Sequence, residues 1–434
     1  MGKVLRMLVC SSLLACAQAQ IGVFASHTDV GTVLHTGSVD YDAATHSYTI
    51  GGSGENMWFA EDDFQFVWTK MSGDVRLSAS VSILDKQGDA HRKAVLMIRQ
   101  SLDPDAAYAD VALHGDGLTS LQFREAKGAV THEIESNVSA PKRLSIEKRG
   151  DSFTMWIGAE DGGLRFAGGS TRVPLQGPFY VGIGVCAHNK DDVRKALFSD
   201  VELTTPSQTG KPAPWSTLET ITVASTDARV SFVAPGRLES PGWSHDGLSL
   251  FFHRDGRMER VAVAGGKPEA MATANSEPSQ RSPDGKTLVF RADRDGKADI
   301  YTKSGERGEE KRLTAGNGVN DAPEFSPDGS YIYFQSGRTG TMQIWRMRPD
   351  GSAPEQVTSD EFSNAFPHLS PDGRQMAFLS WEGGGENMLL RVLSLSDRKA
   401  ITLCQFAGGR GSMDAPSWSP DGHRLAFVSY QLIQ

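Results

Sequence analysis

Pro323-Glu324-Phe325-Ser326-Pro327-Asp328-Gly329 is one of five copies of a short phrase in the C-terminal half of the chain. The other copies are Pro241-Gly242-Trp243-Ser244-His245-Asp246-Gly247, Pro278-Ser279-Gln280-Arg281-Ser282-Pro283-Asp284-Gly285, Pro367-His368-Leu369-Ser370-Pro371-Asp372-Gly373 and Pro416-Ser417-Trp418-Ser419-Pro420-Asp421-Gly422. Their aspartates lie 38, 44, 44 and 49 residues apart. A period of this length with several strand-like segments is typical of the blades of a β-propeller.

Each phrase has the chemistry of a tight turn and is followed by an apolar segment. Proline presets φ, aspartate accepts hydrogen bonds from the backbone after it, and glycine takes up positive φ at no steric cost. The apolar segments are residues 248–252, 288–290, 331–334, 376–379 and 425–428. They do not alternate with polar residues, which is expected of inner strands that are buried on both faces between stacked blades.

On these five phrases the region 218–434 resembles the TolB-type propeller repeat, which is found in bacterial envelope proteins and in prolyl-oligopeptidase-type peptidases. We expect five blades, with the six of TolB as the alternative. The sequence ends after the second strand of the last repeat. Residues 219–224 and 229–233 are therefore predicted to complete the last blade and to close the ring with strands from both ends, which removes exposed sheet edges.

The region before residue 204 carries short strand patterns and no repeat. Residues 74–83 alternate apolar and polar side chains without a slip, and turn signals such as Arg149-Gly150-Asp151 separate the segments. This pattern of short alternating segments and turns predicts a β-sandwich. The whole chain is therefore expected to be all-β. The motifs Trp58-Phe59, residues 94–99 and residues 180–184 resemble a concanavalin-like jelly roll of the laminin-G/glucanase type. That resemblance implies sugar binding or a structural role, and the paired-carboxylate pattern of the glucanases is absent from the sequence.

The N-terminus has the pattern of an export signal. Lys3 and Arg6 precede an apolar core, and Ala17-Gln18-Ala19 fits a small-x-small cleavage site. Leu13-Leu14-Ala15-Cys16 also resembles a bacterial lipobox, so lipidation at Cys16 is an alternative. The expected organisation is a signal peptide at 1–19, the jelly roll at 20–203, a Pro/Ser/Thr-rich linker at 204–217 and the propeller at 218–434. The expected location is periplasmic or secreted, with a lipid anchor as the alternative.

Charge and motif content exclude several classes of function. The formal net charge of −9 argues against a nucleic-acid partner, because such binding needs a basic surface. No Gly-x-Ser-x-Gly nucleophile elbow and no phosphate-binding glycine loop occurs in the sequence. The eleven histidines are scattered, so we expect no metal site, no cofactor and no catalytic residue. Cys186 and Cys404 are predicted to be buried, inert thiols.

Polar residues precede the first proline of every phrase, where the chain enters the innermost strand at one mouth of the central channel. These candidate ligand-binding residues are Glu239, Asn275, Glu277, Asn320, Asp321, Asn364 and Asp414. A ring of carboxylates and amides at a channel mouth suits a basic protein segment, a cation or a sugar, although Asp and Asn are also common loop residues. In the sandwich, Tyr108 follows Asp103-Pro104-Asp105 and is the candidate for stacking on a sugar.

The sequence therefore predicts an exported, monomeric, TolB-like binding or scaffold protein of the bacterial envelope. Its partner is expected to be an envelope protein or a polysaccharide held at the propeller mouth. The alternative is a carbohydrate-active hydrolase or lyase that uses the carboxylates of the mouth. A purely structural extracellular spacer is the third hypothesis.

Overall fold

The computed structural model describes residues 21–159, 162–206, 211–271, 280–294, 296–305, 307–316, 318–384, 387–413 and 415–433. The export signal, the cleavage site and Cys16 lie outside these residues. The described chain is all-β, as predicted, with one short 3₁₀ helix, η1 (Arg410–Ser412). None of its helices is long and apolar enough to cross a membrane.

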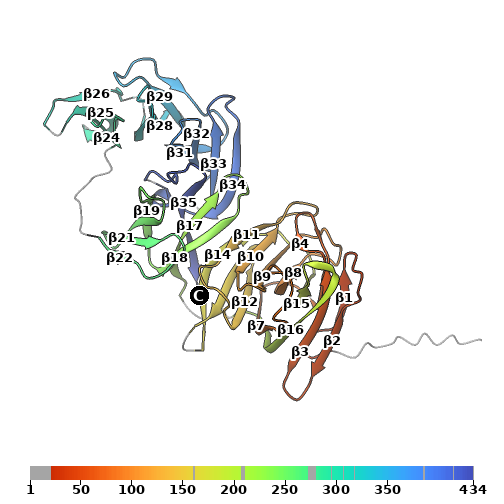
Figure 1. Cartoon of the computed structure of the whole chain (residues 1–434). Helices are drawn as coiled ribbons and strands as arrows, with labels where there is room; N and C mark the ends of the chain where they lie inside the picture. The colour runs from red at the N-terminus through yellow and green to blue at the C-terminus, as the bar shows by residue number, and fades with distance from the viewer. Residues whose placement is uncertain are drawn as a thin grey trace, which may run out of the picture.

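Two large sheets build the N-terminal half (Figure 1). The first contains, in spatial order, β1 (Ser26–Val30), β6 (Phe64–Met71), β15 (Phe179–Cys186), β8 (Lys93–Arg99), β9 (Tyr108–His114), β10 (Thr119–Arg124) and β11 (His132–Glu135). The second contains β14 (Leu164–Arg172), β13 (Ser152–Gly158), β12 (Arg143–Arg149), β7 (Val75–Ile83), β16 (Asn189–Thr204), β3 (Ser47–Gly54) and β2 (Ser38–Asp42). A separate two-stranded sheet joins β4 (Met57–Trp58) to β5 (Glu61–Asp62).

The core of this half lies between the two sheets. Leu77 and Ile146 of the second sheet belong to the same buried cluster as Leu96 and Ile183 of the first. The alternation predicted for residues 74–83 holds over most of β7, where Val75, Leu77 and Val81 are buried. Burial of one side-chain row from each sheet is the arrangement expected for a two-layer β domain.

The first sheet continues without a break into the C-terminal half. β11 pairs in parallel with β18 (Ala228–Pro235), β18 pairs with β17 (Ala213–Thr222), and β17 pairs with β35 (Arg424–Ile433), which completes a ten-stranded sheet. The segment expected to be a linker, 204–217, therefore needs correction, because β16 ends at Thr204 and β17 already begins at Ala213. Residues 213–217 pair with β35 and are therefore part of the sheet.

The pairing of β17 with β35 confirms that the two ends of the repeat region share one sheet. The ten residues of β17 all have a partner on β35, from Ala213 opposite Ile433 to Thr222 opposite Arg424. Residues 219–224 and 229–233, which were predicted to complete the last blade, provide much of β17 and β18. The strand at the start of the repeat region is thus held by the strand at its end.

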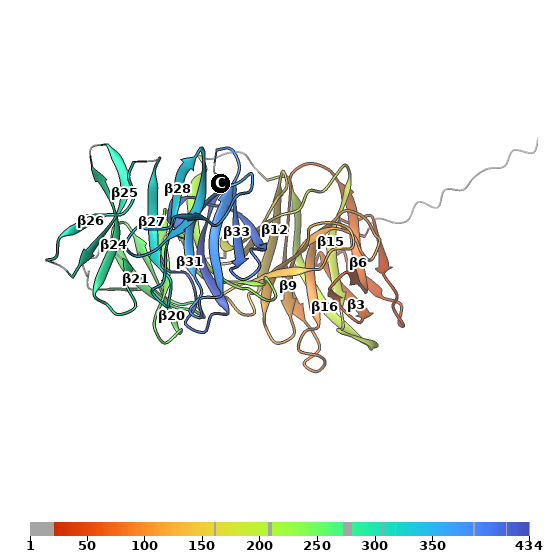
Figure 2. The ribbon, with the colours of Figure 1, turned by 90° about the horizontal axis from the view of Figure 1, so that it is seen from above.

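Four further sheets of four strands each give the C-terminal half a propeller-like arrangement (Figure 2). The first two are β19 (Leu238–Trp243), β20 (Ser249–Arg254), β21 (Arg257–Ala262) and β22 (Glu269–Ala270), then β23 (Gln280–Arg281), β24 (Thr287–Arg294), β25 (Lys297–Ser304) and β26 (Glu310–Arg312). The last two are β27 (Asn320–Phe325), β28 (Ile332–Thr339), β29 (Thr341–Met347) and β30 (Glu355–Gln356), then β31 (Ser363–Leu369), β32 (Gln375–Trp381), β33 (Asn387–Ser394) and β34 (Ala400–Ala407).

The first four repeated phrases form the turns between the first and second strands of these sheets, and the fifth precedes β35. In the copy at 323–329, Ser326 donates a hydrogen bond to Asp328 (2.6 Å), and Asp328 also accepts from the Ser330 backbone. These bonds lower the pKa of the Asp328 carboxyl. Gly329 has φ of 71°, as the turn requires. The prediction that this phrase forms a tight turn is therefore confirmed.

Successive turns pack against each other through proline and glycine. The position of a Cβ on Gly329 lies 3.5 Å from Pro283 of the preceding phrase, and Gly373 and Gly422 meet Pro327 and Pro371 in the same way. Gly247 of the first phrase meets Pro420 of the last, which again joins the two ends of the region. Gly285 has no such neighbour within 4 Å. The phrase that would supply one carries His245 in place of proline.

The phrase without this proline lies at the junction between β19–β22 and β23–β26. At this junction the described residues do not show the closed ring that we expected. Buried clusters join sheet β23–β26 to β27–β30, β27–β30 to β31–β34, β31–β34 to the β35–β17–β18 strands, and these strands to β19–β22. Among the described residues, no buried cluster joins β19–β22 to β23–β26, and Figure 1 shows these two sheets apart. The described residues therefore do not show the packing at this junction that a ring closed at every junction requires.

Val428→Ala tests the energetic weight of the shared sheet. Val428 is fully buried in the cluster that joins β35 and β17 to β19–β22. Removing its two methyl groups is expected to lower the free energy of unfolding by about 2 kcal/mol, from lost burial and the cavity left behind. Urea unfolding followed by tryptophan fluorescence measures this loss. Leu432→Ala on the same strand, with a side chain 73% exposed, is the control and should change stability by less than about 0.5 kcal/mol.

Candidate functional site

Four of the predicted propeller-mouth residues lie within the described part of the chain, at or near the start of the first strand of three sheets. Asn320 and Asp321 start β27, Asn364 lies at the start of β31, and Glu239 lies in β19. Asn275, Glu277 and Asp414 lie outside the described residues. The structure therefore reports on four of the seven candidates.

Asn320 and Asn364 are fully buried, and protein groups occupy their polar atoms. The Asn320 amide donates to Asp299 (3.0 Å), and its oxygen accepts from Ser336 (2.7 Å). The Asn364 amide donates to Gln343 (2.9 Å), and its oxygen accepts from Ser380 (2.6 Å). The expectation that these two amides bind a ligand at the channel mouth is corrected, because their hydrogen-bonding capacity is used inside the sheets.

The two hydrogen-bond networks have the same arrangement at equivalent positions of two sheets. Thr314 donates to Asp299, and Thr358 donates to Gln343. Each threonine hydroxyl also accepts a hydrogen bond from the backbone N–H of the residue directly after its acceptor, Ile300 or Ile344. Burial alone raises the pKa of Asp299, but the hydrogen bonds from Thr314 and Arg312 outweigh this effect and lower it. The asparagines thus tie the third strand of one sheet to the first strand of the next.

Asp321 and Glu239 are the two candidate carboxylates that remain near the surface. Asp321 accepts a hydrogen bond from Arg410 (2.5 Å) and lies 3.8 Å from the Arg291 guanidinium. Glu239 packs beside Gly411, whose Cβ position would lie 2.7 Å from its side chain. Both carboxylates therefore flank η1, with Arg410 neutralising the first of them. Asp321, Glu239 and Arg410 therefore form a surface of mixed charge around η1.

A buried contact between Glu324 and His368 joins β27 to β31. The sequence analysis did not predict that these two residues pair. His368 Nδ1 lies 2.7 Å from Glu324 Oε2, and its Nε2 lies 2.9 Å from the Met413 carbonyl oxygen. The second oxygen of Glu324 accepts from the Leu369 backbone (2.9 Å). His368 is thus a strand residue with a structural contact. The available signal was that Glu324 and His368 occupy the same position of the phrase, directly after its first proline.

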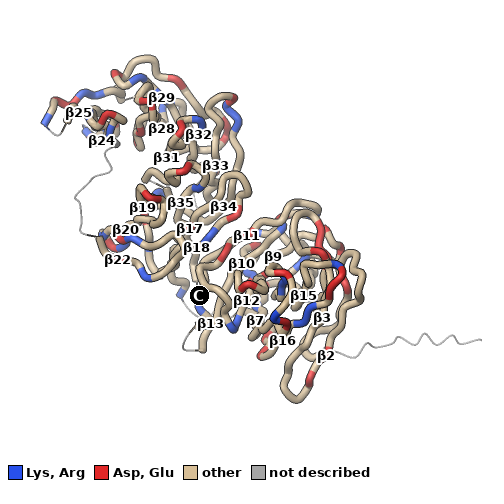
Figure 3. Tube along the Cα trace, in the orientation of Figure 1, with Lys and Arg blue, Asp and Glu red and all other residues tan. Residues whose placement is uncertain are grey.

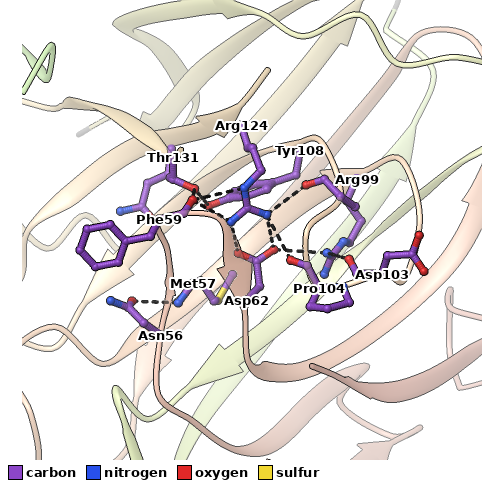
Figure 4. A network of polar contacts seen from close by, with 12 residues as sticks. Asn56, Met57, Phe59, Asp62, Arg99, Asp103, Pro104, Tyr108, Arg124 and Thr131 are labelled. Carbon is purple, nitrogen blue, oxygen red and sulfur yellow. Dashed lines mark hydrogen bonds and ion pairs between the residues drawn. The ribbon is translucent and has the colours of Figure 1, made fainter. Parts of the chain in front are cut away.

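The prediction that Tyr108 stacks on a sugar is wrong, because this side chain is fully buried. Figure 4 shows it within a polar network on the face of the first sheet that points away from the sandwich core. The Arg124 guanidinium lies 5.0 Å from the Tyr108 ring centre, and the hydroxyl lies 3.2 Å from Thr131 Oγ1. The polar loop 103–105 before Tyr108 accepts hydrogen bonds from Arg99 and Arg124 through its backbone carbonyls.

Asp62 is the centre of this network. Its carboxylate accepts two hydrogen bonds from Arg124 (2.8 and 3.0 Å) and one from Arg99 (3.2 Å), and all three side chains are fully buried. Arg99 and Arg124 also donate to backbone carbonyls of the loops that cover the sheet, at Asp103 and Phe59. The cluster therefore anchors the covering loops to β8 and β10. Sequence analysis did not identify it, because its members are scattered over four segments.

A second polar row lies beside it on the same sheet face. Asp110 is fully buried, and neither carboxylate oxygen has a hydrogen-bond partner within the described protein. Burial raises the pKa of Asp110 well above its ordinary value, while the Lys93 ammonium acts in the opposite direction. Lys93 donates to the Met57 carbonyl (3.0 Å) and to Gln122 (3.2 Å). Alternating polar residues at 108, 110 and 114 of β9 were the signal for this row.

No group of three or more His, Cys, Asp or Glu residues in the described part of the chain is arranged to hold a metal ion. Of the two cysteines expected to be inert, Cys186 is buried, and burial raises the pKa of its thiol to about 11. Cys404 is only partly buried, although desolvation also raises its pKa. Both thiols are therefore protonated at neutral pH.

The folds and surfaces described above define a β-propeller protein with an N-terminal two-sheet domain. Residues 238–431 match the family model of the TolB β-propeller domain. An uncharacterized protein of Agrobacterium fabrum is 32% identical over 270 residues, which span 50% of this chain and 92% of that protein. The chain belongs to the TolB β-propeller family through its C-terminal half.

Two solved structures are similar to parts of the chain. One, from Agrobacterium tumefaciens and assigned provisionally to TolB, is 31% identical with a TM-score of 0.45, and the match covers 52% of this chain and all of that one. TolB of Acinetobacter baumannii is 18% identical with a TM-score of 0.32, over 59% of this chain and 77% of that one.

Proposed function

We propose that this protein is an exported, TolB-type envelope protein that binds a partner without chemical turnover. The observation that carries the proposal is the surface around η1, where Asp321, Arg410 and Glu239 sit at the entry of the innermost strands. Mixed charges on loops of a rigid scaffold suit recognition of a protein segment. Relatives named TolB support an envelope location and a protein partner, and a polysaccharide is the other partner class that we propose.

The proposal includes the organisation inferred from the sequence. We propose that the β35–β17–β18 strands act as a fifth blade beside the four four-stranded sheets. We also propose that the two-sheet half is a concanavalin-like jelly roll, and that the mature protein is a monomer in the periplasm or outside the cell. The enzyme alternative needs free carboxylates at the mouth, and the Arg410 contact with Asp321 does not favour it.

Substituting both mouth carboxylates tests the binding role. The full-length protein and its Asp321→Ala/Glu239→Ala variant are immobilised and exposed to envelope extract of the native host, and recovered proteins are quantified by mass spectrometry. We expect recovery of the partner to fall about tenfold in the variant, because charge pairs at an interface set orientation and dissociation. The free energy of unfolding should fall by less than about 1 kcal/mol, since the arginines that pair with these carboxylates, Arg410 and Arg237, are themselves exposed.

Glu355→Ala is the matched control, because Glu355 is also held by two arginines, Arg346 and Arg398, on the outer strand β30. It should leave recovery unchanged. Equal recovery by the mouth variant and the wild type would refute the proposed binding surface. Hydrolysis of a polysaccharide panel by the wild type, lost on Asp321→Asn, would support the enzyme alternative instead.

A further inference from the structure

A cleft of about 530 Å³ lies where the N-terminal sheets meet the shared strands of the C-terminal half. Its size lies within the range of about 300–1,000 Å³ that is usual for ligand sites, and junctions between structural units are common places for them. The mouth of the propeller does not contribute to it. The cleft is therefore a second candidate site, built from other residues than the surface around η1.

The pattern of lining residues distinguishes sheet faces from sheet edges. From β12 and β13 every second residue lines the cleft, namely Glu147, Arg149, Ser152, Thr154 and Trp156. Successive side chains of a strand point to opposite faces, so these residues form a floor from one face of the second sheet. From β14, β34 and β35 consecutive residues line it, at 170–172, 405–407 and 430–433. A strand contributes consecutive residues where its backbone edge faces the space.

These three strands are all terminal strands of their sheets. β14 ends the seven-stranded sheet, β34 ends the sheet β31–β34, and β35 ends the ten-stranded sheet. The edge of a terminal strand presents N–H and C=O groups that can pair with another extended chain. The cleft is therefore lined by strand edges, and such edges can bind a peptide by strand addition.

The charge of the cleft is opposite to that of the whole chain. Its lining includes three arginines, Arg149, Arg172 and Arg237, and one carboxylate, Glu147. Glu147 already forms ion pairs with Arg76 and Arg149. Arg172 is exposed, and the Arg237 side chain is 66% exposed, with its guanidinium 5.1 Å from the Tyr430 ring centre. Figure 3 shows basic positions gathered around β13 and the C-terminal end of the chain.

We propose that this cleft binds an extended acidic peptide segment of a partner protein, which adds as a strand to an edge that faces it. Backbone pairing supplies affinity, and the arginines select acidic side chains on the face that points to the floor. The net charge of −9 makes the protein as a whole repel acidic partners, so the local basic lining defines where such a segment docks. Arg237 also lies 3.8 Å from Glu239 of the proposed mouth surface, so the two sites adjoin at this ion pair while the rest of the cleft lining is separate.

The probe is a fluorescein-labelled octapeptide of alternating valine and glutamate, and fluorescence anisotropy measures its affinity for the full-length protein. We expect saturable binding that weakens with added salt. The variant Arg172→Glu/Arg237→Glu should bind at least about tenfold more weakly. The matched control Arg165→Glu/Arg257→Glu reverses two exposed arginines that do not line the cleft, one of them on the same strand β14, and should bind as the wild type does.

Two further arms identify the mode of binding. Methylating the amide nitrogens of one alternating set of peptide residues should abolish binding, because strand addition uses every second N–H on one side. The peptide should bind the Asp321→Ala variant normally, which separates this site from the mouth. The proposal is overturned if both methylated sets bind like the parent, if a valine–lysine octapeptide binds equally well, or if only tetragalacturonate binds in an arginine-dependent way.

Discussion

Replacing Asp62 with asparagine is expected to lower the free energy of unfolding by about 3–5 kcal/mol, the largest loss for any single substitution considered in this protein. Asp62 provides the only carboxylate that the described structure pairs with the buried guanidinium groups of Arg99 and Arg124. Asparagine keeps the size but removes the negative charge, and it points N–H groups at two cations. A charge left uncompensated in a buried site typically costs this much.

Urea unfolding of the full-length protein measures this loss. Asp103→Asn is the control, because the Asp103 side chain is 56% exposed, lies in a loop next to the same network and pairs with the exposed Lys127. It should cost less than about 1 kcal/mol. Similar losses in the two variants would mean that the Asp62 cluster does not hold the covering loops in place.

Raising the pH from 5 to 8 is expected to destabilise the protein through Glu219, by about 3 kcal/mol. Glu219 is buried in β17 and accepts one hydrogen bond from Ser429 (2.6 Å), and burial raises the pKa of its carboxyl from 4.5 to about 7. Between these values the folded state keeps a proton that the unfolded state has lost. Stability is therefore fully present below about pH 4.5 and is lost as the pH rises through 7.

Glu219→Gln should remove this dependence, since glutamine keeps the acceptor for Ser429 and carries no charge. The variant should match the wild type at pH 5 and exceed its urea midpoint at pH 8. The surrounding cavity also contains Glu125, His132, Glu133 and Cys404, and burial raises the pKa of Glu133 too, so a smaller slope should remain. Glu269→Gln, with an exposed carboxylate, is the control. Parallel pH profiles for wild type and Glu219→Gln would contradict the assignment.

The repeated phrase was sufficient to predict the four-stranded sheets, because turn chemistry and apolar runs act locally. The pairing of β17 with β35 was also predictable, since a missing strand pair at one end matched two unassigned strands at the other. What the sequence could not show was the continuation of the first N-terminal sheet through β11 and β18. That contact depends on how two separate units meet, and it involves a parallel bridge of few residues.

The candidate site was predicted less well than the fold, for a physical reason. Asn320, Asn364 and Tyr108 are polar residues next to turns, where an exposed side chain is the ordinary expectation. In the structure each is buried with partners supplied by distant segments, such as Asp299, Gln343 and Arg124. Asp321 and Glu239 are only partly buried, and both contact residues of η1, Arg410 and Gly411.

The pairing of β11 with β18 has a practical consequence for anyone who divides this chain into fragments. A cut between Thr204 and Ala213 would fall between β16 and β17. It would nevertheless divide the strands of the ten-stranded sheet between the two fragments. Each piece would then carry a freshly uncovered strand margin, which invites self-association during expression. Soluble material for either half is better sought in the intact polypeptide, with single substitutions in place of truncation.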